Sequence, residues 1–372
     1  MSDIWRVLLS VFGQTPKNNT PINQGSANIR SIHAVKHKQK AEEKWFVFTI
    51  SKETPKQAGQ MVGQPGGEGT VYSLLDKPKI LVKIYHPEKL AKGRNDYQSK
   101  IDAMISIKEQ FNNVNVCWPL LSVYDASHQW IGYAMKQGTG VPMRYLAHAV
   151  AYKKYFQNLN RVLVLQYLLS FLKNINMLHQ QNVFIGDYNL LNFLCDSSNN
   201  KVTMIDSDSY QLNISNKFFP CPVGSADLTP IEHQDRNFKD VVRNIKSEEF
   251  SVAIIIFECL MLGRHPYDVV DGDDPVTNLR NGNFPYGKGR GGYHVIPKGP
   301  WYNIWSHMPF RVKSLFIQTF TDGVKDPSKR ASINDWLTEL STYLNEMNRG
   351  WHNKEISPME PKKQEYHGNK SV

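Results

Sequence analysis

The sequence has few cysteines and no long apolar run. Four cysteines occur in 372 residues and none forms a C-x-x-C pair. This excludes a disulfide framework and disfavours a zinc site. Free thiols are typical of a reducing compartment, so a cytoplasmic location is expected. No run approaches the roughly 18 apolar residues of a membrane span. The most apolar segment, Phe250 to Leu262, carries Glu258 and is predicted to be a buried helix.

A secretory signal is also lacking, because the N-terminal segment has neither a basic start nor a small-residue cleavage site. Acidic residues are outnumbered, with 34 Asp and Glu against 44 Lys and Arg, so the net charge is +10. A basic balance indicates an anionic partner: nucleic acid, an acidic membrane surface or a phosphate-rich ligand. Charge alone does not choose among these three.

The order of patterns along the chain predicts an α+β protein. Residues 1–43 are interpreted as an extension with a short amphipathic helix and a polar linker. Residues 44–138 carry short strand-like runs, including 45–50, 71–74, 80–85, 116–124 and 130–135. Residues 139–344 are mainly helical, and 345–372 form a polar tail. We therefore expect a small antiparallel β-sheet lobe followed by a larger helical lobe.

A glycine-rich segment, V-G-Q-P-G-G-E-G-T-V-Y, lies between two of these runs and ends at Tyr72. Glycines let backbone N–H groups approach phosphate oxygens without a clash from Cβ atoms. On the next strand, Leu81, Lys83 and Tyr85 share one face and Ile80, Val82 and Ile84 share the other. A lysine on an inward face requires an anion, so Lys83 is predicted to reach phosphates held by the glycines.

The strongest signal is D-x-x-x-x-N followed by an aspartate at a strand end, which places Asp187, Asn192 and Asp206 in order. Phosphoryl transfer needs these residue types. One carboxylate orients the acceptor hydroxyl and takes its proton, while an amide and a second carboxylate hold Mg²⁺ against the phosphates. The spacing therefore predicts a phosphoryl-transfer site.

These motifs resemble the protein kinase superfamily over about residues 60–342. The chain looks closest to a divergent bacterial serine/threonine-kinase-like branch. Further matching segments are C-P-V-G-S from Cys221, T-P-I-E from Thr229, L-G-R-H-P-Y from Leu262 and D-P-S-K-R from Asp326. The resemblance implies a bilobal fold and a structural ion pair between Glu232 and Arg330.

The resemblance also implies a role for each matching residue. Asp187 is the expected catalytic base, Lys83 the ligand of the α- and β-phosphates, and Asn192 and Asp206 the magnesium ligands. Lys83 and Asn192 are thus counted with Asp187 as catalytic. The residues expected around ATP, glycines over the phosphates and the others around the adenine, are Gly63, Gly66, Gly67, Gly69, Val71, Lys83, Met135, Lys136, Gln137 and Leu194.

Several positions depart from the family pattern. Gln64 stands at the first loop glycine, so Gly63 is expected to serve with a shifted turn. Asn189 replaces the lysine that follows the catalytic Asp, and Ile185 and Gly186 replace its His-Arg. Without that Arg, activation is expected to be independent of phosphorylation in the segment 207–229. No glutamate follows in 89–108, and the candidate partners of Lys83 there are Asp96, Gln98 and Asp102.

Four functions follow from these patterns. The first is an ATP- and Mg²⁺-dependent kinase that phosphorylates Ser or Thr of a protein substrate in bacterial signalling. The alternatives are a pseudokinase that binds nucleotide as an interaction module, and a small-molecule phosphotransferase. A nucleic-acid binder is disfavoured, because no recognition helix or zinc spacing is present. In bacterial relatives such kinases accompany a metal-dependent protein phosphatase and a von Willebrand-type protein, which the resemblance suggests as partners.

Overall fold

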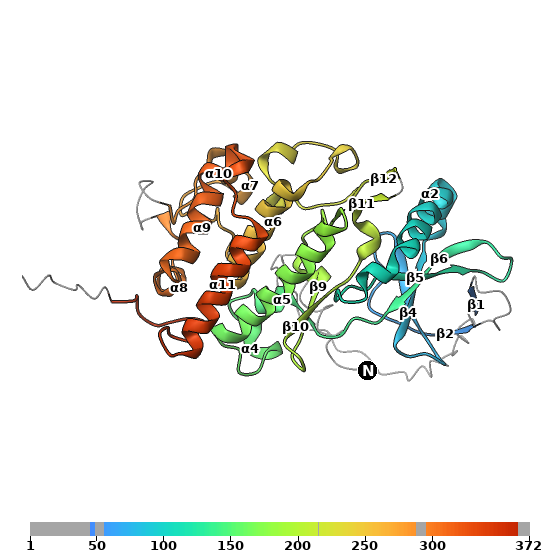
Figure 1. Cartoon of the computed structure of the whole chain (residues 1–372), viewed down its shortest axis with the longest axis horizontal. Helices are drawn as coiled ribbons and strands as arrows, with labels where there is room; N and C mark the ends of the chain where they lie inside the picture. Colours follow the sequence, from blue (N-terminus) through green and yellow to red (C-terminus); the bar gives the residue numbers. More distant parts are fainter. Residues whose placement is uncertain (1–44, 49–55, 215, 288–294, 364–372) are drawn as a thin grey trace, which may run out of the picture.

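The structure, a computed structural model, describes residues 45–48, 56–214, 216–287 and 295–363. Strands gather at one end of the molecule with helix α2 (Pro87–Ser106), and the longer helices α5, α6 and α11 lie at the other (Figure 1). This arrangement confirms the predicted α+β class, with a small antiparallel lobe and a larger helical lobe. The short helix and linker predicted within residues 1–43 lie outside the described residues.

The small lobe is an antiparallel sheet that closes on itself in the order β1-β2-β3-β4-β6-β5. Strand β1 closes it by pairing with both β2 and β5. Strand β2 was not predicted, because its sequence KQAGQM lacks the β-branched and aromatic residues that favour strands. The strands are β1 (Trp45–Phe48), β2 (Lys56–Met61), β3 (Gly69–Leu74), β4 (Ile80–Tyr85), β5 (Pro119–Tyr124) and β6 (Trp130–Lys136).

The two faces of β4 pack against different groups, as the alternation in its sequence predicted. Val82 is fully buried in a small cluster with Leu74, Val123 and Ala134. Leu81 and Tyr85, on the opposite face, join the main core that continues into the helical lobe. Lys83 shares that second face, so the strand itself directs the lysine toward the junction of the two lobes.

The large lobe is built around two helices of the main core. Helix α5 buries a face that includes Leu165, Leu168 and Leu172, and α6 is buried from Ser247 to Leu260. The helices of this lobe are α3 (Met143–Leu146), α4 (Tyr152–Tyr155), α5 (Arg161–Gln180), α6 (Ile245–Leu260), α7 (Pro275–Asn281), α8 (Trp301–His307), α9 (Phe310–Phe320), α10 (Asp322–Lys325) and α11 (Ile333–Asn348). Its strands are β7 (Val141–Pro142), β8 (Val183–Phe184), β9 (Phe193–Asp196), β10 (Lys201–Met204), β11 (Gln211–Ile214) and β12 (Lys217–Phe219).

Helix α6 confirms the buried helix predicted from its apolar run, but it begins five residues earlier than Phe250. Asn244 caps its N-terminus with a capping box. The Asn244 side chain accepts from the backbone N–H of Ser247, and the Ser247 hydroxyl oxygen accepts from the backbone N–H of Asn244. The early start matters for function, because it places Glu248 in the first turn of a buried helix.

The polar tail predicted from residue 345 begins inside α11 and then packs against the helical lobe as far as residue 363. The buried guanidinium of Arg161 accounts for this return of the chain. It donates to the carbonyl oxygen of Leu260 and to that of Ile356, each at 2.7 Å. Ile356 is itself buried, so sequence polarity concealed a docked segment.

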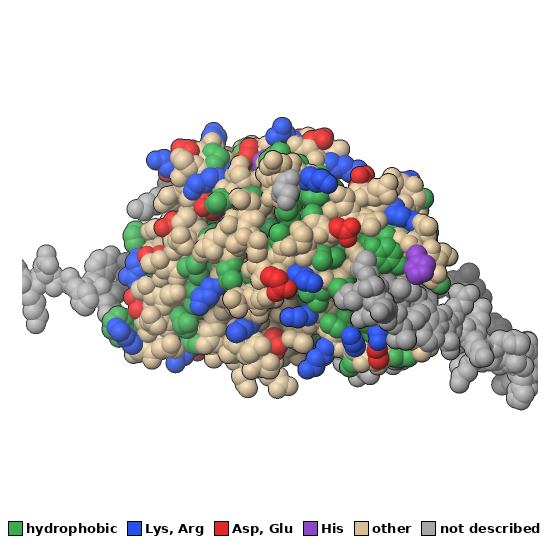
Figure 2. Space-filling view, turned by 45° about the vertical axis from the view of Figure 1, so that its right-hand side comes forward, with side chains coloured by type: hydrophobic (Ala, Val, Ile, Leu, Met, Phe, Trp, Pro, Cys, Tyr) green, Lys and Arg blue, Asp and Glu red, His purple; other side chains and the backbone are tan. Residues whose placement is uncertain are grey.

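The described residues contain neither a disulfide nor a membrane-spanning helix. All four cysteines are free and buried, and no described helix is both long and apolar enough to cross a membrane. On the face shown in Figure 2, Lys and Arg side chains are spread among acidic ones. The positive side chains on that face are therefore not gathered into one patch.

Candidate active site

Four polar residues that the motifs predicted to act together meet where the lobes join. Lys83 comes from β4, Asp187 and Asn192 from the loop between β8 and β9, and Asp206 follows β10. The Lys83 ammonium donates to Oδ1 of Asp206 at 2.7 Å. The Asn192 amide lies 3.4 Å from Oδ2 of Asp187. Residues separated by up to 123 positions in the sequence thus form one charged site.

The carboxyl group of Asp187 has the environment of a general base. Burial raises its pKa, and the negative charge of Asp206 raises it further, while Arg243 and the Asn192 amide lower it. The net effect is a pKa above the ordinary value for aspartate. A carboxylate with a raised pKa holds a transferred proton better at neutral pH than an ordinary one, which is what general-base catalysis requires.

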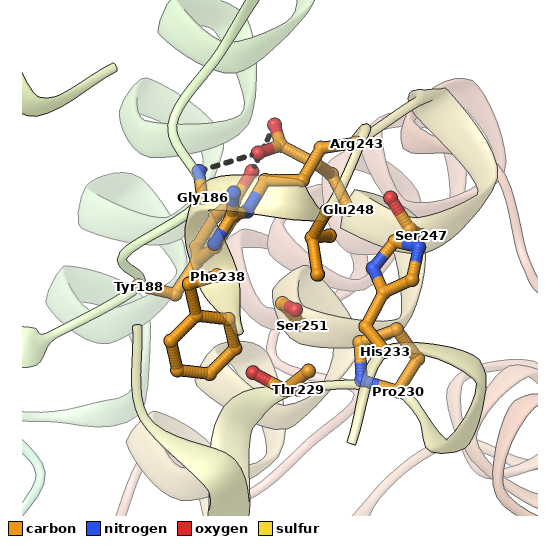
Figure 3. Close-up of a pocket in the computed structure, with 11 residues that line it drawn as sticks. Gly186, Tyr188, Thr229, Pro230, His233, Phe238, Arg243, Ser247, Glu248 and Ser251 are labelled. Atoms are coloured by element: carbon orange, nitrogen blue, oxygen red, sulfur yellow. Dashed lines mark hydrogen bonds between the residues drawn. The ribbon is translucent and has the colours of Figure 1, made fainter. Parts of the chain in front are cut away.

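Glu248 fixes the loop that carries Asp187. Its carboxylate accepts from the backbone N–H of Gly186 and from the Tyr188 hydroxyl, both at 2.7 Å (Figure 3). His179 is also buried, with its Nε2 atom 2.8 Å from Oε2 of Glu248. A buried carboxylate with three partners is well satisfied, so it can hold both flanks of Asp187 in place.

Arg243 occupies the region where the sequence lacked an arginine beside Asp187. Its guanidinium lies next to Gly186 and donates to the carbonyl oxygens of Cys221 and Val223, each at 2.8 Å. The Gln211 side chain exchanges two further hydrogen bonds with the Arg243 backbone. The motifs C-P-V-G-S and T-P-I-E in residues 221–232 resemble the end of a kinase activation segment, and this stretch is here called the activation segment. It is held by a cation bound to its backbone carbonyls.

The ion pair expected between Glu232 and Arg330 is present. The two carboxylate oxygens of Glu232 accept from Nη1 and Nη2 of Arg330 at 2.7 and 2.8 Å. Arg330 also donates to the carbonyl oxygens of Gly323 and Lys246. This bidentate geometry fixes the end of the activation segment to the start of α6.

The glycine-rich loop spans residues 62–68 between β2 and β3. Gly63 has φ = +76°, which fits the shifted turn expected from Gln64. Gly69 pairs with Tyr85, and a Cβ there would lie 2.3 Å from the carbonyl oxygen of Ile84, so only glycine permits this approach of β3 to β4. A Cβ on Gly67 would meet nothing within 4 Å, so this part of the loop faces open space.

The loop is tied to the end of β4 and to α2. His86 donates its backbone N–H to the carbonyl oxygen of Glu68 at 2.9 Å. The Nε2 atom of its ring lies 2.8 Å from the carbonyl oxygen of Gly66. The Glu68 carboxyl is hydrogen-bonded to Tyr97, and burial together with the charge of Asp208 raises its pKa. Sequence reasoning gave Glu68 no role, although it stands in the center of the motif.

Of the residues expected around an adenine ring, Val71 is paired in register with Lys83, and Leu194 approaches Gly138 in the connection between the lobes. Met135 ends the buried part of β6, and Lys136 is exposed. The N–H of Gln137 donates to the carbonyl oxygen of Lys79 at 2.9 Å. That donor is therefore engaged within the protein, while the role of Gln137 in binding adenine stays a prediction.

Asn192 and Asp206 offer the oxygen ligands that Mg²⁺ prefers. Asp206 has φ = +61°, and 43% of its side chain is exposed. This exposure fits a carboxylate that can accept a hydrated cation beside bound phosphates. Within the described residues, no group of three or more His, Cys, Asp or Glu side chains is arranged to hold a metal ion.

The acidic partner of Lys83 is the residue that sequence reasoning missed. The predicted candidates lie in α2, but Asp102 accepts from the hydroxyl of Ser122 at 2.7 Å. Asp208 contacts the Lys83 ammonium with both oxygens, each at 2.8 Å. Its signal in the sequence was the second aspartate of D-S-D, two residues after Asp206.

Two curated proteins are similar to this chain over most of its length. No family model matches the sequence. The chain is 26% identical over 312 residues to Protein kinase YegI of Escherichia coli strain K12, a match covering 82% of this chain and 47% of that protein. For Protein kinase YegI of Escherichia coli O157:H7 the identity is 26% over 291 residues, covering 76% and 44%. The chain spans about half the length of the curated relatives it matches. Its similarity to them over most of its own length supports a divergent relationship to protein kinases.

Proposed function

We propose that this protein transfers the γ-phosphate of ATP, in the presence of Mg²⁺, to Ser or Thr hydroxyls of a protein substrate. The observation that carries the proposal is the convergence of Lys83, Asp187, Asn192 and Asp206 in one site at the junction of the lobes. Homology to a named protein kinase over most of the chain agrees with it.

Each side chain has a task in this reaction. Lys83 binds phosphate oxygens, and Asp187 accepts the proton of the attacking hydroxyl. Asn192 and Asp206 would hold Mg²⁺, which when bound neutralises charge on the phosphates. The protein thereby contributes position and electrostatic stabilisation, which supply most of the rate enhancement in phosphoryl transfer.

The activation segment supports a protein rather than a small molecule as acceptor. Arg243 holds the carbonyls of Cys221 and Val223, and the Glu232–Arg330 pair holds the end of the segment. The side chains of Val223 and Phe218 are exposed on this segment and on the preceding strand β12. An ordered, partly apolar segment beside the catalytic loop is suited to an extended peptide.

The decisive experiment uses radiolabelled ATP and Mg²⁺ with the wild type, Asp187→Asn and Asp102→Asn. We expect label on protein Ser or Thr with the wild type and with Asp102→Asn, identified by mass spectrometry, and a loss of at least 100-fold with Asp187→Asn. Equal labelling with Asp187→Asn would contradict the assigned base. Labelling of small alcohols without protein would contradict the protein substrate.

A second candidate is a nucleotide-binding interaction module without transfer. It is favoured by Asn189, whose side chain caps the turn after Asp187 where a lysine would supply positive charge. It is also favoured by the engagement of Lys83 with Asp206. Nucleotide binding by equilibrium dialysis, unchanged in Asp187→Asn and accompanied by no labelling, would support this candidate over the kinase.

A further inference from the structure

The ammonium group of Lys83 is buried between two aspartates from one turn. Asp208 binds it with both oxygens at 2.8 Å, whereas Asp206 uses a single oxygen at 2.7 Å. Only 1% of the Asp208 side chain is exposed, compared with 43% for Asp206. Asp208 is therefore buried in the interior, whereas Asp206 is partly exposed to solvent.

Two tyrosines hold the Asp208 carboxylate from neighbouring strands. The Tyr85 hydroxyl of β4 donates to Oδ2 at 2.6 Å, and the Tyr133 hydroxyl of β6 donates to Oδ1 at 2.8 Å. The Tyr85 ring stacks on Trp130, with ring centers 5.6 Å apart. Burial raises the pKa of both tyrosines, so both remain donors at any physiological pH. The carboxylate thus sits in a rigid, fully hydrogen-bonded pocket.

Helix α2 supplies no acidic side chain to this cluster in the described structure. Asp102 is bonded to Ser122, Asp96 is exposed, and Gln98 lies in a groove beside Lys217. The residues of α2 that approach the cluster are Tyr97, whose ring lies 4.6 Å from that of Tyr85, and the cation Lys100. The helix packs against the pocket without providing the anion.

We propose that Asp208 is the positioning residue of Lys83, in place of an acidic residue on the helix that follows the lysine strand. This inference rests on the function proposed above for Lys83. The oxygens of Asp208 contact Lys83 independently of Asp206, so the lysine keeps its place when the exposed carboxylate is used elsewhere. The orientation of Lys83 then depends on the turn 206–208 and on two tyrosines, and not on a movement of α2.

The first test measures Lys83 directly, without any need for activity. The rate of acylation of Lys83 by a small amine-reactive reagent is measured at one pH near neutrality by mass spectrometry. The ammonium is buried and held by three carboxylate oxygens, so Lys83 of the wild type should react slowly. In Asp208→Asn we expect the rate to rise at least tenfold, because the charged carboxylate that holds the ammonium with both oxygens is lost.

Asp102→Asn is the matched control, since it removes an α2 carboxylate that does not contact Lys83, and its acylation rate should equal that of the wild type. Asp208→Glu keeps the charge, so its acylation rate should stay within threefold of the wild type. This variant carries the test if the asparagine variant does not fold. An unchanged rate in Asp208→Asn, an equal rise in Asp102→Asn, or a tenfold rise in Asp208→Glu would overturn the proposal.

The second test asks whether the position of Lys83 matters for nucleotide. We expect Asp208→Asn to lower kcat/KM for ATP at least tenfold, and Asp102→Asn to stay within twofold of the wild type. If the wild type transfers no phosphate, the proposed function fails, but the acylation rate of Lys83 still decides the role of Asp208. A raised acylation rate in Asp208→Asn with unchanged kcat/KM would show that Asp208 binds Lys83 without positioning it, which contradicts the proposal.

Discussion

Arg243 lies in the space that a side chain at position 186 would fill. A Cβ atom on Gly186 would lie 2.6 Å from Nε of Arg243 and 2.7 Å from Sγ of Cys221. Gly186 also has φ = +70°, a conformation that other residues adopt only with strain. The small residue before Asp187 and the distant Arg243 therefore depend on each other, because any larger side chain at position 186 would displace the arginine.

This relationship predicts the effect of Gly186→Ala. The methyl group must displace a guanidinium that is bonded to two carbonyls, so we expect a loss of about 1–3 kcal/mol in the free energy of unfolding. Urea denaturation followed by circular dichroism measures it. Gly67→Ala is the control, because its Cβ meets nothing within 4 Å and its stability should change by less than about 0.5 kcal/mol. Equal stability of the two variants would contradict the clash.

The activation segment predicts that phosphorylation at Ser225 is dispensable. Arg243 already donates hydrogen bonds to the carbonyl oxygens on either side of Pro222, so no phosphate is needed to order the chain around Ser225. Ser225→Ala should keep phosphate transfer within twofold of the wild type in the labelling assay. Complete loss of transfer would show that the hydroxyl is a required phosphorylation site.

The earlier expectation covered every hydroxyl in the segment 207–229, and the structure narrows the test. The hydroxyls of Ser207, Ser209 and Thr229 donate to backbone carbonyl oxygens. Replacing them would remove hydrogen bonds within the protein as well as hydroxyls that could be phosphorylated, so these variants do not isolate phosphorylation. Ser215 lies outside the described residues.

The Glu232–Arg330 pair predicts a large and coupled loss of stability. Arg330→Met leaves a partly buried carboxylate without its partner and should cost about 3–5 kcal/mol. The double variant with Glu232→Gln should cost less than the sum of the single changes, since both act on one interaction. The exposed pair of Arg311 and Glu339 offers the control, where Arg311→Met should cost less than about 1 kcal/mol.

The same pair has a pH dependence whose sign is fixed. Burial raises the pKa of the Glu232 carboxyl, but the bonds and charge of Arg330 outweigh this and lower it below 4.5. Its stabilisation is therefore present above the unfolded value of 4.5 and is lost as the pH falls through the lower folded value. The advantage of the wild type over Arg330→Met in unfolding free energy should therefore shrink as the pH falls from 7 through the folded pKa of Glu232, and urea denaturation at several pH values measures it.

Lys100 predicts a dependence of the same sign in a more alkaline pH range. Burial lowers the pKa of its ammonium to about 8, and its Nζ atom is 3.4 Å from the carbonyl oxygen of Pro220. Between about pH 8 and 10.5 the unfolded chain binds a proton that the folded protein releases, so the stability contributed at this site rises with pH.

We expect the difference in unfolding free energy between the wild type and Lys100→Met to shift in favour of the wild type from pH 7 to pH 10. Urea denaturation at several pH values measures this difference. Lys92→Met, which changes an exposed lysine of the same helix, should show a constant difference. Parallel curves for Lys100→Met and the wild type would contradict the effect of burial.

Local patterns in the sequence account for the parts of the site that are short in range. The alternation of β4 placed Lys83 opposite Val82, and the spacing of Asp187 and Asn192 placed them in one loop, because backbone geometry fixes both. The apolar run that became α6 needed no long-range information. Strand β2 escaped detection because its side chains are polar and its pairing with β3 decides its conformation.

The sequence by itself determined the fold class, the order of the lobes and the polar residues that gather between them, since these depend on periodicity and on spacing along the chain. Only the tertiary structure decided their partners: Asp208 beside Lys83, Glu248 beside Gly186, and Arg243 against the activation segment. A buried charge is stabilised by an opposite charge or dipole within about 3 Å. Packing determines which group lies at that distance, and spacing along the sequence does not encode distances between separate segments.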